Sequence, residues 1–422
     1  MSDWIEAPLS QLVTFQKGRK VDTSAFAGEG FSAYLGASGI KDGDDGYAAT
    51  QLAVIAKPTD TLMLWDGERS GLVGFGKQGV VASTVSKLSP NEHIEPKYLF
   101  FALSDRFGWI QHRRTGTGVP HVPKDLGRIL KLRYPRTPTV QKKIASILTT
   151  TDSAIEKTEA LIAKYQQIKT GLMHDLFTRG VLPNGQLRPP RSEAPELYQE
   201  AAIGWVPREW DVLPIGTILT RIDAGWSPEC QEIPPGAGEW GILKVSAVTR
   251  GLYNPSESKS FPQEMVPDPT IEVTDGDVIL TRANGVAELV GVTVQVRNTP
   301  TKLMLSDKLL RLVPEQEKMT KDFLALLMCS TSIKNQIDSV MSGSSGQRNI
   351  SQSQIKNFCC IRPCLNEQQR IVTYIRAVEV NLERENLAKE KLTLQKLGLM
   401  QDLLTGKVPV SVDEPAPEAA HA

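Results

Sequence analysis

Two long stretches of the chain carry a helical pattern of apolar residues. From about 140 to 177 there is no proline and one glycine, and apolar residues or threonine recur at alternating steps of three and four. This spacing is typical of a coiled-coil seam. A second stretch, 365–405, repeats the pattern with a polar middle, where Glu385 and Lys389 occupy seam positions. The expected seam residues are Leu148, Ile155, Ile162, Leu172, Ile375, Leu382, Leu392 and Leu399.

Each stretch predicts a rod, because roughly 38 helical residues span about 55–60 Å. One amphipathic rod cannot bury its apolar stripe alone, so we expect the two helices to pack against each other. The alternative is that each helix packs only on its own neighbouring domain.

The segments outside the helices have a different pattern. Short β-type runs at 61–65, 278–281 and 309–313 are separated by Gly, Asp, Asn and Pro. This pattern predicts domains that are mostly β. Short helices are expected near 96–111 and 321–339. The fold class is therefore α+β.

The chain contains an internal duplication. GLMHDLFT at 171–178 returns 227 residues later as GLMQDLLT at 398–405, and the same offset carries KKI at 142–144 onto QRI at 369–371. We infer a tandem repeat of one domain followed by one helix. The predicted parts are a first domain 1–138, helix 139–178, an extended Pro-rich linker 179–208, a second domain 209–364, helix 365–405 and a disordered tail 406–422.

Composition narrows the possible functions. The 48 Lys and Arg balance 48 Asp and Glu, so the chain has no global basic field, although local patches remain possible. Five cysteines do not make a disulfide framework, and Cys359, Cys360 and Cys364 lack nearby histidine; we predict free thiols and no metal. With neither a signal peptide nor a membrane-length apolar run, a cytoplasmic protein is expected.

The arrangement resembles the specificity subunits of Type I restriction-modification systems over nearly the whole chain. QKKIA at 141–145 and QQRIV at 368–372 follow proline-containing loops, like the PPLxEQKRI start of the family's helices. Both GLMxDL runs match the family's helix end, and IGWVPREW at 203–210 looks like the IGxIPxxW lead-in to its second domain. The first copy departs from the pattern, because RTPT at 136–139 lacks the double proline and the glutamate.

The resemblance implies two tandem-duplicated target-recognition domains separated by two helices that form an antiparallel coiled coil. Each domain would read one half of a split, asymmetric site in double-stranded DNA, and the helices would set the gap. They would also dock two methyltransferase (M) subunits, which two restriction (R) subunits join for cleavage. The chain itself would have no catalytic residue and bind no cofactor. S-adenosylmethionine, and ATP with magnesium, would belong to its partners.

Three loops in each domain are candidates for DNA contact, because Lys and Arg suit phosphates, Arg suits guanine, and Gln and Asn suit adenine. The first domain offers Lys17, Arg19, Lys20, Arg69, Arg113, Arg114, Thr117 and His121. The second offers Arg221, Trp226, Arg282, Asn284, Ser344, Gln347, Arg348 and Asn349. The structural alternative for each is a plain turn or a solvated side chain.

Two other functions stay open at this point. A standalone DNA methyltransferase would need a cofactor site, and it is disfavoured because the chain has no Asn/Asp-Pro-Pro-Tyr segment for methylating adenine. The chain also lacks a GxxxxGK[ST] loop, which agrees with ATP chemistry lying on a partner. A coiled-coil adaptor of another defence system, binding protein or DNA, is favoured mildly by the neutral charge.

Overall fold

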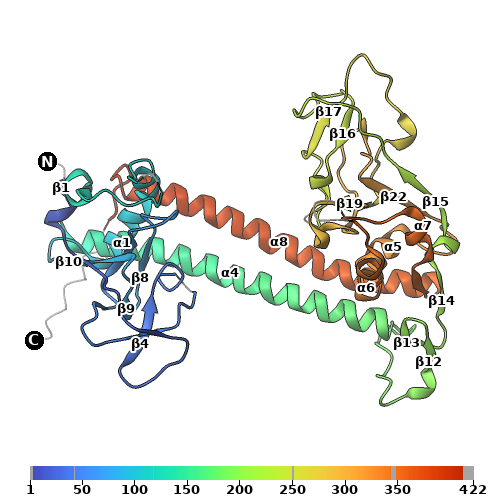
Figure 1. Ribbon diagram of the computed structural model, residues 1–422, viewed down its shortest axis with the longest axis horizontal. Helices are drawn as coiled ribbons and strands as arrows, with labels where there is room; N and C mark the ends of the chain where they lie inside the picture. Colours follow the sequence, from blue (N-terminus) through green and yellow to red (C-terminus); the bar gives the residue numbers. More distant parts are fainter. Residues whose placement is uncertain (1–2, 42, 117, 250, 344–347, 412–422) are drawn as a thin grey trace, which may run out of the picture. The chain divides into compact units, whose positions relative to one another are not determined.

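The computed structural model describes residues 3–41, 43–116, 118–249, 251–343 and 348–411 (Figure 1). The chain forms two compact units. Unit 1 comprises Met1–Leu161 and Glu385–Ala422, and unit 2 comprises Ile162–Arg384. Each unit therefore contains one β-rich domain and a part of each long helix.

The domain of unit 1 is built on three sheets and three short helices. The sheets have the strand orders β1-β11, β2-β10-β7-β8 and β3-β5-β4-β9-β6. The strands are β1 (Trp4–Pro8), β2 (Val13–Lys17), β3 (Thr23–Ser24), β4 (Phe31–Leu35), β5 (Tyr47–Ala49), β6 (Ile55–Ala56), β7 (Thr61–Leu64), β8 (Val73–Phe75), β9 (Gly79–Val81), β10 (Val85–Pro90) and β11 (Lys131–Pro135). The helices are α1 (Pro96–Asp105), α2 (Phe107–Gln111) and α3 (Leu126–Ile129).

The domain of unit 2 repeats this plan with insertions. Its strands are β14 (Asp211–Pro214), β15 (Leu219–Ala224), β16 (Gly241–Leu243), β17 (Ser258–Ser260), β18 (Val278–Thr281), β19 (Ala283–Asn284), β20 (Thr293–Gln295), β21 (Leu303–Met304), β22 (Leu309–Pro314), β23 (Arg348–Asn349) and β24 (Cys359–Arg362). Its helices are α5 (Lys321–Met328), α6 (Thr331–Val340) and α7 (Gln352–Asn357).

The duplication predicted from short motifs extends to the strand order. The order β2-β10-β7-β8 in unit 1 matches β15-β22-β18-β20 in unit 2, and the pair β1-β11 matches β14-β24. The central strands β7 and β18 are buried along their whole length. Because successive side chains point to opposite faces, Met63 joins one core cluster while Leu62 joins another, and Leu280 and Ile279 do the same in unit 2.

One buried glutamine in each unit explains the QKKI and QQRI motifs. Gln141 donates to the carbonyls of Pro135 and His93, and its own carbonyl accepts from the N–H of Glu95, the residue that caps α1. Gln368, 227 residues later, makes the same three bonds to Pro363, Lys318 and Thr320, the cap of α5. Each glutamine therefore ties the start of a long helix to its domain.

The two long helices are α4 (Pro138–Thr178) and α8 (Leu365–Leu403). In unit 1 they run antiparallel, because Asp152 pairs with Lys396 at 2.5 Å and Glu159 pairs with Lys389 at 2.7 Å. In unit 2 Lys169 and Glu379 pair at 2.7 Å. The polar seam positions thus carry ion pairs between the helices.

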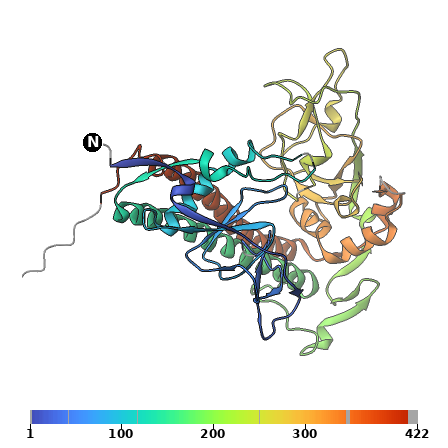
Figure 2. The same cartoon turned by 60° about the vertical axis from the view of Figure 1, so that its left-hand side comes forward.

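The expected seam residues all face inward to some degree. Leu148 and Ile375 are fully buried. The remaining six are buried or half-buried: Ile155, Ile162, Leu172, Leu382, Leu392 and Leu399. Figures 1 and 2 show α4 and α8 side by side. The predicted antiparallel helix pair is confirmed.

Each domain is built on the start of one helix and the end of the other. In unit 1, Met400 and Leu403 of α8 join the core cluster of Leu148. In unit 2, Leu176 of α4 joins the cluster of Ile375. A glycine of positive φ follows each helix and packs closely on a tryptophan: Gly406 on Trp4 and Gly180 on Trp210. The alternative in which each helix packs only on its own domain is wrong.

The predicted extended linker is folded. Strands β12 (Tyr198–Ala201) and β13 (Gly204–Pro207) form an antiparallel hairpin, which Figures 1 and 2 show beyond the end of α4. The linker also carries Arg188, whose side chain is 3% exposed and bound to Glu367. The Pro-rich composition reflects local backbone preference, whereas the hairpin depends on strand pairing and the Arg188–Glu367 ion pair on a residue far away in the chain. In the predicted tail, 412–422 lie outside the described residues.

Candidate nucleic-acid interface

Asp66 joins the three loops predicted in the first domain. It follows β7, and its carboxylate accepts from Nζ of Lys17 at 2.9 Å and pairs with Nδ1 of His121 at 2.7 Å. The N–H of Gly67 donates to the carbonyl of Pro120. This backbone hydrogen bond also joins the loop of Arg69 to the loop of His121. The structure therefore brings the loops of Lys17, Arg69 and His121 to one place.

Asp66 gives His121 a defined orientation. A carboxylate can only accept a hydrogen bond, so Nδ1 of His121 carries the proton. Its Nε2 is then left for an outside partner. Asp66 itself is acidic, and its contribution to this interface is to position Lys17 and His121.

The remaining basic candidates of the first domain differ in exposure. Arg114 is half-buried and donates to the carbonyls of Glu68 and Gln111, so it holds two loops together. The exposed group comprises Arg19, Lys20, Arg69 and Arg113, of which Arg113 lies 3.9 Å from the centre of the Trp109 ring. Thr117 lies outside the described residues.

Two of the predicted loops in the second domain are joined as a small sheet. Strand β19 pairs with β23, which places Asn284 opposite Arg348 and Ala283 opposite Asn349. The side chains of Arg348 and Asn349 are exposed, and Asn284 accepts from the N–H of Val286. Ser344 and Gln347 lie outside the described residues.

The backbone frame of these loops is the same in both units. The N–H of Val122 donates to the carbonyl of Trp65 at 2.9 Å, and the N–H of Ile350 donates to the carbonyl of Arg282 at 2.9 Å. Asp66 and His121 form a bridge in unit 1 where Ala283 and Asn349 pair in unit 2. The two units therefore share this backbone frame but carry different side chains at corresponding positions.

Trp226 and Arg221 have different relations to this frame. Trp226 is 40% exposed, packs edge-on against Phe261, and donates its N–H to the carbonyl of Leu305. Arg221 pairs with Asp223 and lies opposite Val313 in β22, whereas Thr281 lies opposite Leu309. Four residues of strand correspond to about 13 Å, so the structure does not bring Arg221 to the other candidates.

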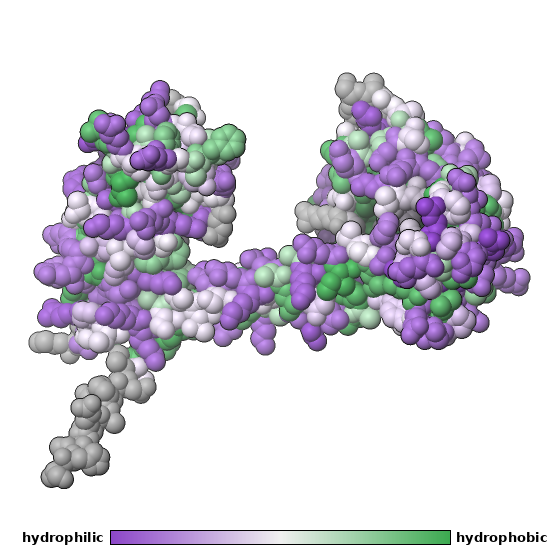
Figure 3. All heavy atoms as spheres, turned by 90° about the horizontal axis from the view of Figure 1, so that it is seen from below, coloured by the Kyte–Doolittle hydropathy of each residue, from purple (hydrophilic) through white to green (hydrophobic). Residues whose placement is uncertain are grey.

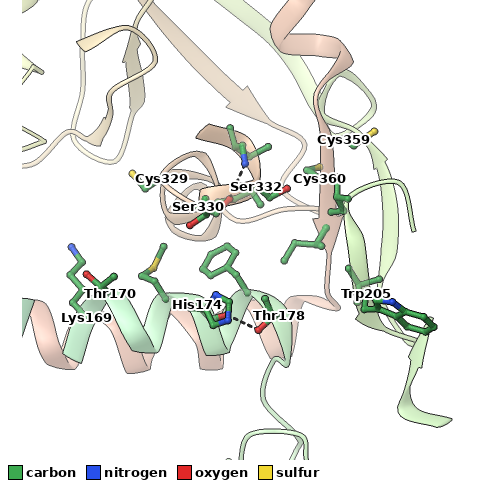
Figure 4. A pocket seen from close by; sticks show the side chains of 18 residues that line it. Lys169, Thr170, His174, Thr178, Trp205, Cys329, Ser330, Ser332, Cys359 and Cys360 are labelled. Carbon is green, nitrogen blue, oxygen red and sulfur yellow. Dashed lines mark hydrogen bonds between the residues drawn. The ribbon is translucent and has the colours of Figure 1, made fainter. Parts of the chain in front are cut away.

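Unit 2 also contains a hollow of about 300 Å³ (Figure 4). It lies between α4, α5, α6, β13 and β24. Two of its polar side chains are engaged: Thr178 donates to the carbonyl of His174, and Lys169 pairs with Glu379. Burial raises the pKa of the Cys360 thiol to about 12, so this thiol stays protonated at neutral pH.

Across the part of the chain that the structure describes, no three His, Cys, Asp or Glu side chains gather as metal ligands would. Within the same part, none of the helices combines the length and the apolar character needed to cross a bilayer.

Comparisons with known proteins agree with this architecture. Residues 1–166 and 244–394 match the Type I restriction modification DNA specificity domain. The chain is 26% identical over 425 residues to the Type I restriction enzyme MjaVIII specificity subunit of Methanocaldococcus jannaschii, covering 97% of this chain and 93% of that protein. It is 31% identical over 238 residues to the EcoEI specificity subunit of Escherichia coli, covering 56% of this chain and 38% of that protein.

Two solved structures share the fold. The Type I restriction-modification S subunit of M. genitalium matches with a TM-score of 0.61 at 14% identity, over 95% of this chain and 96% of that chain. A chain from a study of complex assembly and conformational transition in a Type I system matches with a TM-score of 0.52 at 15% identity, over 96% and 98%.

Proposed function

The chain belongs to the family of Type I restriction-modification specificity subunits, and from this premise we propose that it reads a bipartite, asymmetric DNA site with one domain per half-site. The observation that carries this proposal is the repeated loop frame. Asp66 and His121 occupy the position in unit 1 that Ala283 and Asn349 occupy in unit 2. One frame with different side chains supports two different half-sites.

The long helices supply a spacer in this proposal. Helix α4 has 41 residues and α8 has 39, and either is about 60 Å long. Half-sites read from one face of DNA lie about 34–36 Å apart, which is within the length of such a helix. The gap between the half-sites would then depend on helix length and not on the loops.

Methyltransferase subunits are the partners we propose for the helices. On α8, Leu387, Leu394 and Leu397 are exposed, and the first two are one heptad apart. Figure 3 shows apolar surface interrupting the polar surface along the helices. Isolated exposed apolar residues are ordinary, but repeated ones on one helix are typical of a surface that a partner covers. S-adenosylmethionine, and ATP where a restriction subunit is present, would be bound by those partners, and this chain would contribute no catalytic residue.

Lengthening both helices tests the spacer. One heptad inserted after Leu161 in α4 and one after Arg384 in α8 should lengthen the gap by about 10 Å, or about three base pairs. The half-site sequences should stay the same, because the loops are untouched. The measurement is the sequence methylated by the assembled complex. An insertion in α4 alone is the control, and it should abolish specific methylation by breaking the helix register.

A change in the half-site sequences after the double insertion would contradict the proposal. So would an unchanged gap with full activity, since the helices would then not set the spacing.

A further inference from the structure

A second pocket lies beside the reading loops of the second domain. It has a volume of about 360 Å³ and is lined by residues of five segments, among them Ser227, Lys244, Lys259, Ser306 and Lys308. None of these residues was a candidate from the sequence. The carbonyl of Lys308 accepts from the N–H of Arg282 at 2.9 Å, and Ser227 follows Trp226 directly. Residues that line the pocket therefore adjoin two of the predicted candidates, Arg282 and Trp226.

The charge of the pocket favours an anion. Three lysines line it against two carboxylates, those of Glu232 and Asp307. Glu232 is engaged, because it pairs with Lys244 at 2.8 Å. Among the described residues, neither Lys259 nor Lys308 forms a salt bridge. Lys259 and Lys308 thus face the pocket together with Asp307, whose carboxylate also forms no salt bridge among the described residues, and the lining carries an excess of one positive charge.

Ser306 gives an independent indication of a ligand. Ser306 is 5% exposed, and its hydroxyl oxygen is buried without a hydrogen-bond partner among the described residues. A buried hydroxyl with no partner costs free energy, so native proteins rarely keep one. In the same pocket the hydroxyl of Ser227 accepts from the N–H of Asp307 at 3.2 Å, which leaves its proton to donate.

We propose that this pocket binds a phosphate of the DNA backbone. Lys259 and Lys308 would neutralise the phosphate, and the exposed hydroxyl of Ser227 would donate to one of its oxygens. The Ser306 hydroxyl is closed to solvent in the free chain, so it would donate after rotating about its Cα–Cβ bond toward the pocket. The proposal rests on the proposed function, and it adds a positioning contact next to the base readers. A fixed phosphate here would set the register in which Asn284 and Arg348 meet base edges.

The Lys308→Gln variant tests whether the lysines bind phosphate. It is measured in the full chain assembled with its methyltransferase subunits. Binding to duplexes with and without the recognised site is measured across a range of salt concentrations. Affinity should fall about tenfold for both duplexes. The slope of log K against log salt should decrease by about 1, as expected for one lost phosphate contact. Lys334→Gln, an equal charge change on exposed α6, is the matched control and should change neither quantity.

Ser306→Ala separates binding from folding. This variant removes a buried hydroxyl that has no partner, so the melting temperature should stay the same or rise. DNA affinity should nevertheless fall for both duplexes. A purely structural serine would instead lower the melting temperature or leave affinity unchanged, and either result overturns the proposal.

The remaining outcomes are also decisive. If the wild-type complex binds its site specifically but Lys308→Gln behaves like Lys334→Gln, the pocket is not a phosphate site and the proposed function stands. If Lys308→Gln relaxes only one base position, Lys308 reads a base and the phosphate proposal fails. If the wild-type complex shows no sequence preference, the proposed function fails and the pocket proposal fails with it.

Discussion

Replacing Glu367 by Ala should lower the free energy of unfolding by about 3–5 kcal/mol, the usual cost of leaving one member of a buried ion pair alone. Glu367 is 2% exposed and accepts from Arg188, from the indole of Trp210 at 3.0 Å and from the N–H of Val181 at 2.8 Å. Trp210 and Val181 would lose the acceptor of these hydrogen bonds, and Arg188 would keep only the exposed Glu209 as a carboxylate partner. Urea unfolding of the full chain, followed by tryptophan fluorescence, measures the loss.

A matched control is available on the same arginine. Glu209 also pairs with Arg188 at 2.7 Å, but its side chain is 75% exposed, so Glu209→Ala should cost less than about 1 kcal/mol. Equal losses of unfolding free energy for Glu367→Ala and Glu209→Ala would contradict this account of the buried Arg188–Glu367 pair. The double replacement Arg188→Met with Glu367→Leu should recover part of the stability, because an apolar pair leaves no buried charge, whereas the N–H groups of Trp210 and Val181 still lack their acceptor.

Replacing Arg348 by Ala should reduce discrimination at one base pair of one half-site by about tenfold to a hundredfold. Arg348 is exposed on β23, opposite Asn284 and within the frame that the two units share. The other half-site should keep its preference, since unit 1 reads it. The measurement is the relative affinity of the assembled complex for duplexes in which each position is varied in turn.

Arg221→Ala is the control for this change. Arg221 is an exposed arginine of the same domain but lies about four residues of strand away from the frame, so its loss should leave base preference unchanged. An equal loss of affinity for every sequence after Arg348→Ala would show that Arg348 contacts phosphate instead.

The helices and the duplication could be predicted from the sequence because their signals are local. The 3,4 spacing of apolar residues that predicts the helices involves only residues within two turns of each other. The duplication is visible directly in the two GLMxDL runs. The structural role of the QKKI and QQRI motifs, however, could not be predicted from the sequence. The role of Gln141 in joining α1 to α4 depends on Pro135 and His93, and their closeness follows from strand pairing that no local pattern contains.

The folding of the linker could not be predicted for a similar reason. Arg188 and Glu367 are 179 residues apart in the chain, so composition alone suggested an extended segment. The missing glutamate in the first copy of the family's motif is also explained by tertiary packing. At the position 227 residues before Glu367 stands Val140, which packs against the apolar core of unit 1.

The candidate interface was predicted in outline but not in its chemistry. The loops around Lys17, Arg69 and His121 do come together, yet the residue that joins them is the acidic Asp66. The basic pocket was missed altogether, because Lys259 and Lys308 are separated in sequence and surrounded by unremarkable residues. A search for runs of basic residues cannot find lysines that only tertiary structure assembles.

The central claim is that one chain reads two half-sites, one with each unit. Mapping methylated adenines in host DNA, in cells with and without this chain, tests it most directly. The account predicts methylation that depends on the chain, at an interrupted sequence with two different specified halves and a gap of fixed length. Methylation within a single uninterrupted sequence, or a pattern unchanged by loss of the chain, would contradict it.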